Sequence, residues 1–160
     1  MAGFAALNLS QNLVLHQSRE VQSFSCGEDP WSLWLTNYLR GTDILDGITR
    51  RKNTAWLFYD DKEELVAFGV VGTNHLVVAG SRRHTIGFIP AVAVHKNHQR
   101  QGVGRHVLAF LVEEAAAAGH DRVFLFVDPD NLAARKLYSD FGFRELPGEQ
   151  KGNLRMLLDI

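Results

Sequence analysis

An apolar run followed by a polar, glycine-containing loop constrains the fold of this chain more than any other feature. Residues 86–94 are apolar and include β-branched side chains, which predicts a buried strand. Residues 95–101 are polar, and Gly102 and Gly104 then open a predicted helix that ends at Gly119. This helix places four apolar residues on one face: Val107, Leu108, Leu111 and Ala115. A strand, a glycine loop and an amphipathic helix therefore follow one another in the second half of the chain.

The residues after this helix repeat the alternation of strand and helix. Arg122 to Val127 is nearly all apolar and predicts a second buried strand, and Asp128 to Asn131 supplies turn and helix-capping residues. A second helix is expected from Leu132 to Asp140, and two final strands from Phe143 to Leu146 and from Leu154 to Leu158. The order of strand, helix, strand, helix and strand predicts an α/β (α+β) domain with a mixed sheet.

The first half of the chain predicts one helix and one hairpin. Apolar residues are dense from Trp31 to Leu39, which is typical of a short helix. Ala55 to Tyr59 and Leu65 to Gly72 are joined by a charged turn, which favours an antiparallel hairpin. No repeat, low-complexity tract or Pro/Gly-rich linker divides the chain, and 160 residues suffice to bury one hydrophobic core. We therefore expect a single domain over residues 1–160.

Composition and charge argue against several classes of protein. The formal net charge of -1 and the pI of 6.6 give no overall attraction to nucleic acid or membrane, and the basic clusters at 50–52 and 82–84 are typical of solvated surface. The single cysteine, Cys26, cannot form an internal disulfide, which favours a reducing compartment. The N-terminus lacks the pattern of a signal peptide, and no apolar run reaches the length of a membrane span. We expect a cytoplasmic protein.

The loop at Gly102 and Gly104 has the properties of an anion-binding site. The first backbone N–H groups of a helix have no partner within it, and two glycines leave them open to a pyrophosphate. Arg100 and Arg105 add cationic side chains. The loop is not a Walker A motif, because no Gly-Lys-Ser/Thr follows, nor a dinucleotide fingerprint, because the third glycine is absent. The alternative is a pair of glycines that only shapes a turn.

Two motifs, in the right order, make residues 86–146 resemble the GNAT superfamily of N-acetyltransferases. The first motif, Arg/Gln-x-x-Gly-x-Gly/Ala after a strand that ends in Val-x-Val, is filled by Val92, Val94, Gln99, Gly102 and Gly104. The second motif, an Asn, a helix with a small residue, a Tyr and then Gly-Phe, is filled by Asn131, Ala134, Tyr138, Gly142 and Phe143. The resemblance implies a mixed, mostly antiparallel central sheet flanked by helices, with splayed central strands that hold acetyl-coenzyme A.

The same resemblance implies which residues bind the cofactor. The backbone of Val92 and Val94 would pair with the pantetheine arm, and the glycine loop would hold the diphosphate. The implied cofactor-binding residues are Val92, Ala93, Val94, Gln99, Arg100, Gln101, Gly102, Val103, Gly104, Arg105, Asn131 and Tyr138. Asn131 is equally suited to cap the helix that follows it, and the two roles are compatible.

Tyr138 is the catalytic residue that the second motif implies. A phenol with an ordinary pKa near 10 stays protonated at neutral pH. It can therefore act as a general acid that protonates the departing coenzyme A thiolate. The alternative is an aromatic side chain that packs between a helix and a strand.

The general base is not identified by the sequence. Many members of the family carry a Glu or a His on the strand before the glycine loop, but residues 86–94 contain no ionisable side chain. The base lies elsewhere, or water carries the proton away, or the acceptor amine is already neutral. His84, just before the strand, is our candidate, ahead of His75, Glu63 and Glu64.

Neither a cysteine nucleophile nor a metal is expected. Cys26 has no paired base in the nearby sequence, so a buried or neutral cysteine is the better interpretation. The histidines and acids show no metal-ligand spacing such as His-Glu-x-x-His.

The acceptor is not identified by the sequence, and three functions stay open. The first is transfer of an acetyl group from acetyl-coenzyme A to a primary amine of an unidentified acceptor. The second is a toxin-type acetyltransferase that acts on the aminoacyl group of charged tRNA, because residues 24–27 and 34–35 resemble the start of that GNAT subgroup. The pI of 6.6 does not promise the basic face that a tRNA binder needs. The third is a non-catalytic domain that binds coenzyme A. A homodimer is the expected assembly from its general frequency.

Overall fold

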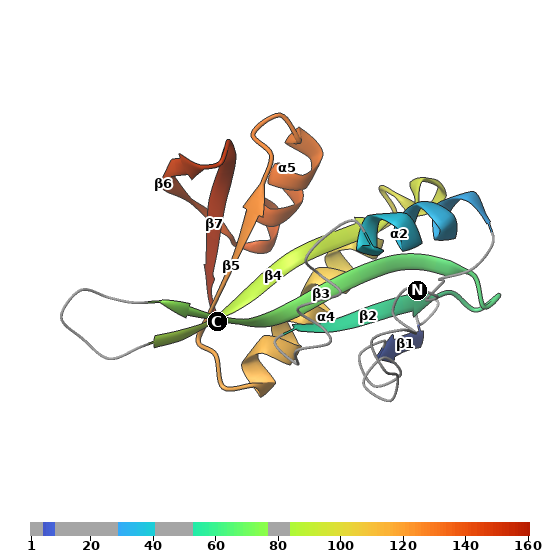
Figure 1. The fold of residues 1–160 in the computed structure, drawn as a ribbon, viewed down its shortest axis with the longest axis horizontal. Coiled ribbons are helices and arrows are strands. Elements are labelled where there is room, and N and C mark those ends of the chain that lie inside the picture. The colour runs from blue at the N-terminus through green and yellow to red at the C-terminus, as the bar shows by residue number, and fades with distance from the viewer. Residues whose placement is uncertain (1–4, 9–28, 41–52, 77–83) are drawn as a thin grey trace.

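The chain forms one mixed sheet with helices on both faces, as the ribbon of Figure 1 shows. The computed structural model describes residues 5–8, 29–40, 53–76 and 84–160. Its elements, in chain order, are β1 (Ala5–Asn8), α2 (Pro30–Arg40), β2 (Asn53–Tyr59), β3 (Leu65–Leu76), β4 (His84–Val94), the 3-10 helix η1 (Lys96–His98), α4 (Val103–Ala117), β5 (Arg122–Val127), α5 (Leu132–Phe141), β6 (Arg144–Gln150) and β7 (Asn153–Asp159).

The sheet has seven strands in the order β1-β2-β3-β4-β5-β7-β6. Neighbouring strands are antiparallel except β4 and β5, which run parallel because α4 connects them. The expected fold class, a mixed and mostly antiparallel sheet flanked by helices, is confirmed.

The main core lies between the sheet and α4. This helix buries the face predicted from the sequence: Val107, Leu108, Leu111 and Ala115. Gly69 of β3 permits a close approach of the helix, because a Cβ at that position would lie 2.8 Å from Cδ1 of Leu111. Complete burial of one such aliphatic side chain stabilises the fold by about 1.5–3 kcal/mol, so this interface holds α4, and the loop before it, firmly against the sheet.

The opposite face of β2 and β3 is covered by α2. Leu35 of α2 packs in one buried cluster with four strand residues: Ala55, Leu57, Phe68 and Val70. The alternate residues Phe58 and Ala67 belong to the core on the α4 side. This alternation is the period of two that a strand imposes on its side chains.

The first turn of α2 is fixed by Asp29. Its Oδ1 accepts hydrogen bonds from the N–H groups of Trp31 and Ser32, at 3.1 Å each, and its Oδ2 accepts one from the Ser32 hydroxyl. These bonds, led by the one from the hydroxyl, hold the pKa of the Asp29 carboxyl below its usual 3.8. Beyond this turn α2 leaves Trp34 and Tyr38 about half and one third exposed, so only part of the apolar helix predicted from the sequence is core.

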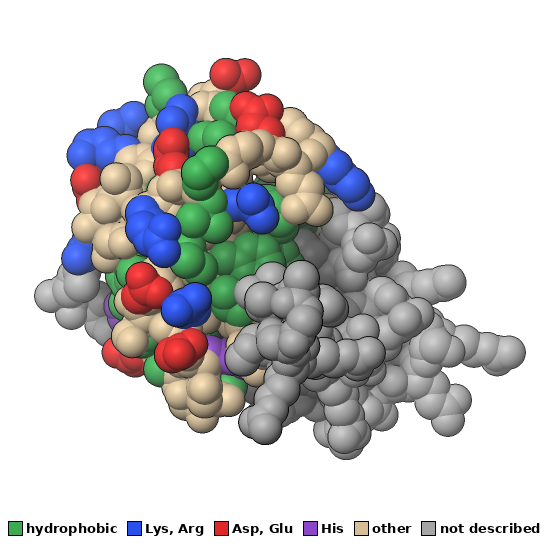
Figure 2. Space-filling view, turned by 90° about the vertical axis from the view of Figure 1, so that its left-hand side faces the viewer, with side chains coloured by type: hydrophobic (Ala, Val, Ile, Leu, Met, Phe, Trp, Pro, Cys, Tyr) green, Lys and Arg blue, Asp and Glu red, His purple; other side chains and the backbone are tan. Residues whose placement is uncertain are grey.

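The other half of the sheet carries an aromatic cluster on the face away from α4. Phe88, Phe124 and Phe126 of β4 and β5 pack together, with centroids of Phe88 and Phe124 4.6 Å apart. In Figure 2 hydrophobic side chains form a band on the visible face, and Lys, Arg, Asp and Glu side chains are mixed beside it.

Three strands differ from the sequence prediction, and one of them is β3, which continues past Gly72 to Leu76. The four-residue β1 was not predicted, because Ala5–Asn8 is too short to show an alternating pattern. The strand expected from Phe143 to Leu146 is β6, which continues to Gln150 through Pro147 and Gly148. β6 is the edge strand of the sheet, and its pairing with β7 is irregular there, so a residue without an N–H group is tolerated.

Several sequence predictions lie outside the described residues. These are the predictions for Cys26, for residues 24–27, for the basic residues 50–52 and 82–83, and for the side chains of His75 and His84. Among the described helices, none has the length and apolar character that a membrane span requires.

Candidate functional site

β4 and β5 are neighbours in the sheet but pair over only part of their length. Gly87 pairs with Val123, Phe88 with Phe124 and Ile89 with Leu125. Pairing between β4 and β5 stops after Ile89 and Leu125. β5 continues to pair with β7 as far as Val127, and Figure 1 shows β4 and β5 diverging. The splay of the central strands expected from the sequence is confirmed.

The part of β4 beyond this point presents main-chain groups to the gap. The His95 N–H donates to the Val66 carbonyl on β3 at 2.8 Å, and main-chain groups alternate sides along a strand. Val92 and Val94 therefore direct their N–H and C=O groups away from β3. The carbonyl of Val94 accepts a hydrogen bond from Nε2 of Gln99 at 3.1 Å. This edge is suited to pair with an extended ligand.

The glycine loop follows β4 and leaves the start of α4 open. Gly102 is the N-cap residue of α4, with φ 80°, and provides no side-chain hydrogen bond to the first turn. A Cβ at Gly102 would meet nothing within 4 Å, whereas a Cβ at Gly104 would lie 3.1 Å from Cδ2 of Leu137 and 3.7 Å from Cγ2 of Val94. Gly102 is therefore required by the left-handed backbone, and Gly104 by the close packing of α4 against α5 and β4.

The gap, the loop and α5 enclose a pocket of about 620 Å³. The residues that were predicted from the sequence and line this pocket are Val92, Val94, Gln99, Arg100, Gly102, Gly104, Arg105, Asn131 and Tyr138. Ala93 and Val103, which were also predicted, do not line it: Ala93 pairs with Phe68 on β3, and Val103 is buried in the core. Gln101 does not line it either, and its side-chain amide donates to the Asn97 carbonyl at 3.3 Å.

The charged side chains around this pocket favour an anionic ligand. Arg100, Arg105 and Lys136 line it, against a single carboxylate, Asp140. Lys136 pairs with Asp140 at 2.7 Å, so the two arginines carry the surplus positive charge. The N-terminus of α4 adds about half a positive charge at the same place.

Tyr138 belongs to the wall of the pocket and to the core at once. It is only 8% exposed, and its ring packs against Phe143 with centroids 5.9 Å apart. Burial raises the pKa of the Tyr138 phenol above 10.0, so this group is a proton donor and not a base at neutral pH. The sequence left core packing and a position in the site as alternatives for Tyr138, and the structure shows that it both packs in the core and lines the pocket.

Asn131 caps α5 and also lines the pocket. Its Oδ1 accepts a hydrogen bond from the Ala134 N–H at 3.1 Å, which confirms the capping role. Arg135 holds the same end of α5, because its Nε and Nη2 donate to Oε1 of Glu145 at 2.9 and 2.7 Å and its Nη1 donates to the Pro129 carbonyl at 3.0 Å. A cap of this kind stabilises a helix by about 1 kcal/mol.

The backbone of His84 lies at the end of β4 that is remote from this pocket. His84 is the first residue of the eleven-residue strand β4, and Val94 at the pocket is the last. At about 3.3 Å per residue these two positions are roughly 33 Å apart. From Thr85 to Val94 the described strand carries no ionisable side chain, so this part of β4 supplies no base next to the pocket, and the side chain of His84 lies outside the described residues.

Two groups of residues were missed by reasoning from the sequence. The first is the rest of the α5 wall apart from Ala134, which the second motif includes: Leu132, Ala133, Lys136, Leu137 and Asp140. Helical spacing from Asn131 identifies part of it, because residues three and four apart share a face. The second group is Asp60, Glu64 and His98, of which the sequence considered only Glu64, as a base; their potential metal-binding atoms lie within 4.8 Å of one another. These residues come from two distant turns, so no local spacing rule finds them.

The split sheet, the open helix start and the cationic pocket are together suited to an elongated ligand with an anionic end. The chain belongs to the acetyltransferase (GNAT) family, whose model matches residues 20–143.

Individual relatives and solved structures that are similar to this chain include N-acetyltransferases. The chain is 29% identical over 129 residues to YobR, an uncharacterized N-acetyltransferase of Bacillus subtilis (strain 168), with 72% of this chain and 47% of the relative covered. Among solved structures, a mutant of the toxin AtaT bound to acetyl-CoA and the C-terminus of the antitoxin AtaR gives a TM-score of 0.63, at 17% identity, covering 98% of this chain and 92% of that one. The PaiA N-acetyltransferase of Thermoplasma acidophilum in complex with coenzyme A gives 0.65, at 12% identity, covering 99% of both chains.

The chain spans less than half of the length of the curated relatives that it matches. At their low sequence identities the solved structures support the fold.

Proposed function

We propose that this protein transfers the acetyl group of acetyl-coenzyme A to a primary amine by direct attack of the amine. The observation that carries the proposal is the convergence of both family motifs on one pocket, with the open edge of β4 on one side and the start of α4 on another. Both are main-chain binding surfaces. Such surfaces suit a ligand that combines an amide-containing arm with a diphosphate.

The residues of the pocket fit coenzyme A in shape and charge. Val92 and Val94 offer main-chain groups to the pantetheine amides. The hydrogen bond from the Gln99 side-chain amide to the Val94 carbonyl would break when the cofactor binds. Gly102 and Gly104 carry no side chain, which leaves the first N–H groups of α4 open to the diphosphate. The arginines of the rim add charge-assisted contacts to the phosphates.

Tyr138 is the general acid in this proposal. When bound, acetyl-coenzyme A supplies an acetyl group activated as a thioester. The amine nitrogen would form a bond to the acetyl carbon and release a proton to solvent, the carbon–sulfur bond would break, and the Tyr138 phenol would donate its proton to the leaving sulfur. Its raised pKa keeps the proton in place until this step, and solvent returns the proton afterwards.

The absence of an ionisable side chain along residues 85–94 of β4 bears on the acceptor. A protonated amine must lose a proton before it attacks, and this strand provides no group to take it. An acceptor with a weakly basic amine, which is partly neutral at physiological pH, therefore fits the site better than a lysine side chain.

A thiol-release assay with acetyl-coenzyme A and a panel of amines tests the proposal. Tyr138→Phe should lower kcat about a hundredfold or more, while the Kd for coenzyme A changes by less than about twofold. Tyr38→Phe removes a phenol hydroxyl from the exposed side of α2 and should leave both values unchanged. Equal loss of kcat and of affinity in Tyr138→Phe would show a structural role. Tight binding of coenzyme A without acetylation of any acceptor would favour a binding domain.

The aminoacyl group of charged tRNA is a second candidate acceptor. Its amine is less basic than that of lysine, which agrees with the empty base position on β4, and a toxin is among the proteins of similar fold. Against it, basic and acidic side chains are mixed among the described residues of the face shown in Figure 2, and these residues form no single basic area. Acetylation of charged tRNA in the same assay, but of no free amine, would select this candidate. We also propose that the reaction takes place in the cytoplasm, where acetyl-coenzyme A is available and a lone cysteine stays reduced.

A further inference from the structure

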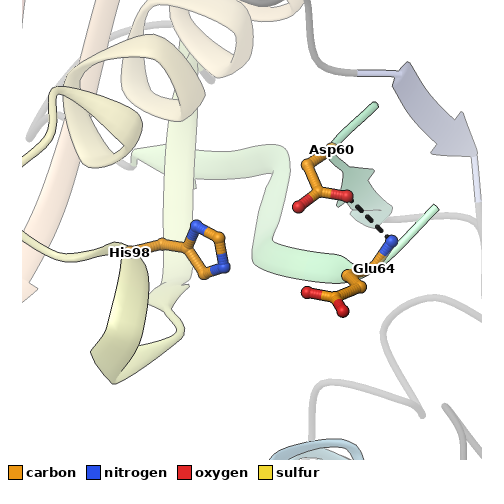
Figure 3. A group of neighbouring side chains, drawn as sticks. All are labelled: Asp60, Glu64 and His98. Carbon is orange, nitrogen blue, oxygen red and sulfur yellow. Dashed lines mark hydrogen bonds between the residues drawn. The ribbon is translucent and has the colours of Figure 1, made fainter. Parts of the chain in front are cut away.

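Three side chains capable of binding a metal meet at the turn between β2 and β3, outside the pocket described above. Asp60 follows the last residue of β2, Glu64 precedes the first residue of β3, and His98 is the last residue of η1. Figure 3 shows the two carboxylates and the imidazole in one small region, with His98 facing the turn from the side of η1. Their potential ligand atoms all lie within 4.8 Å of one another.

Hydrogen bonds hold both turns in place. Oδ1 of Asp60 accepts from the N–H groups of Lys62 and Glu64, at 2.9 Å each, which leaves its second oxygen available to a further partner. The His98 N–H donates to the His95 carbonyl at 2.8 Å, and Nδ1 of His95 accepts from the Asn97 N–H at 3.0 Å. The backbones that carry the three side chains are therefore ordered before any ion binds.

The cavity beside this cluster shares Glu64 and His98 with it and adds further groups that favour a cation. It has a volume of about 430 Å³ and is lined by three carboxylates, two imidazoles and four other residues: Asp29, Glu63, Glu64, His95, His98, Ser32, Tyr59, Leu65 and Asn97. No lysine or arginine is among these described lining residues. Negative charge accumulates there without a basic partner in the lining, which attracts a positive ion.

We propose that Asp60, Glu64 and His98 form a binding site for a divalent transition-metal ion, with Zn²⁺ as the best match. An imidazole with two carboxylates suits Zn²⁺ better than Mg²⁺, which prefers oxygen ligands alone. Ligands about 2.1 Å from a tetrahedral zinc lie about 3.4 Å from one another. Because the ligand atoms lie within 4.8 Å of one another, the side chains must approach by up to about 1.4 Å. Glu64 is exposed and free to turn inward, and water fills the fourth position.

Among the described residues, no hydrogen bond links the side chain of His98 to that of Asp60 or Glu64. A bound ion would join these side chains. It would tie the β2–β3 turn to η1, and the residue after His98 is Gln99, which lines the pocket and holds the Val94 carbonyl. The site is separate from the pocket residues, so the proposal does not depend on the proposed acetyl transfer.

Titration calorimetry of the full chain with Zn²⁺ alone tests the proposal. We expect one ion per chain at this site and a rise in the midpoint of thermal unfolding with Zn²⁺, because a ligand that binds the folded state stabilises it. His98→Asn, and the double variant Asp60→Asn with Glu64→Gln, should weaken binding at least about tenfold. Asn at position 60 keeps an oxygen for the turn hydrogen bonds, so the fold should be retained.

Asp61→Asn is the matched control, because it removes a carboxylate from the same turn but from outside both the cluster and the lining of the cavity. It should bind Zn²⁺ as the unchanged chain does. Anomalous diffraction at the zinc edge should then place the ion between the three side chains. Failure to detect binding to the folded chain, or equal affinity in His98→Asn and Asp61→Asn, would overturn the proposal.

Discussion

Replacement of Gly102 by Ala separates the conformational role of the glycine loop from its role in binding. Gly102 has φ 80°, and a Cβ there would meet no atom within 4 Å, so the substitution strains the backbone without a steric clash. A left-handed non-glycine residue costs about 1 kcal/mol, which lowers the midpoint of thermal unfolding by about 2–4 °C in a chain of this size. The variant therefore stays folded at room temperature.

The effect of Gly102→Ala on coenzyme A should be much larger than its effect on stability. If the methyl group keeps the diphosphate from one main-chain N–H, the loss is that of a hydrogen bond to a charged group, about 1.5–3 kcal/mol. This corresponds to a Kd roughly 10- to 150-fold weaker. Titration calorimetry with coenzyme A and a thermal unfolding curve measure the two effects on the same sample.

Gly119→Ala provides the matched control. Gly119 has φ 91°, an added Cβ there also meets nothing within 4 Å, and the residue follows the far end of α4. Its stability should fall by about the same 1 kcal/mol, while the Kd for coenzyme A stays within about twofold of the original value. If both variants bind coenzyme A equally well, the main-chain donors at the start of α4 do not hold the diphosphate.

Two further predictions concern stability. The Ser32 hydroxyl and backbone N–H groups lower the pKa of Asp29, so the ionised carboxylate stabilises the fold above the unfolded pKa near 3.8, and this stabilisation is lost as the pH falls through the lower folded pKa. Asp29→Asn should therefore make the free energy of unfolding less dependent on pH between about 5 and 2. An unchanged pH dependence would contradict this. Leu111→Ala should lower the free energy of unfolding by about 3 kcal/mol, because Leu111 is fully buried between α4 and the sheet. Leu132 is 70% exposed, so Leu132→Ala should lower it by less than about 0.5 kcal/mol in chemical denaturation. Equal losses would show that the α4 interface is not the main core.

The second half of the fold could be predicted from the sequence because its signals are local. β5 begins and ends where the apolar run does, at Arg122 and Val127, and α4 buries the face that helical spacing selects. β1 and the extension of β6 carry no such pattern, since their pairing is supplied by neighbouring strands.

The site could be predicted only where a motif carries it. The two motifs locate most residues of the pocket, because a helix start and a strand end have fixed main-chain geometry. His84 shows the limit of this reasoning, since a residue close to a strand in sequence lies a full strand length from its other end. The cluster of Asp60, Glu64 and His98 depends on the packing of two separate turns, which spacing along the chain does not encode.

The interrupted pairing of β4 and β5 also bears on solubility. An unpaired strand edge is a template on which another polypeptide can add a strand and begin to aggregate. Here the exposed edge lies inside a cleft between two diverging strands, Pro90 contributes no N–H group to it, and Gln99 occupies the carbonyl at its outer end. This placement makes the unpaired edge of β4 less accessible to a strand of another polypeptide.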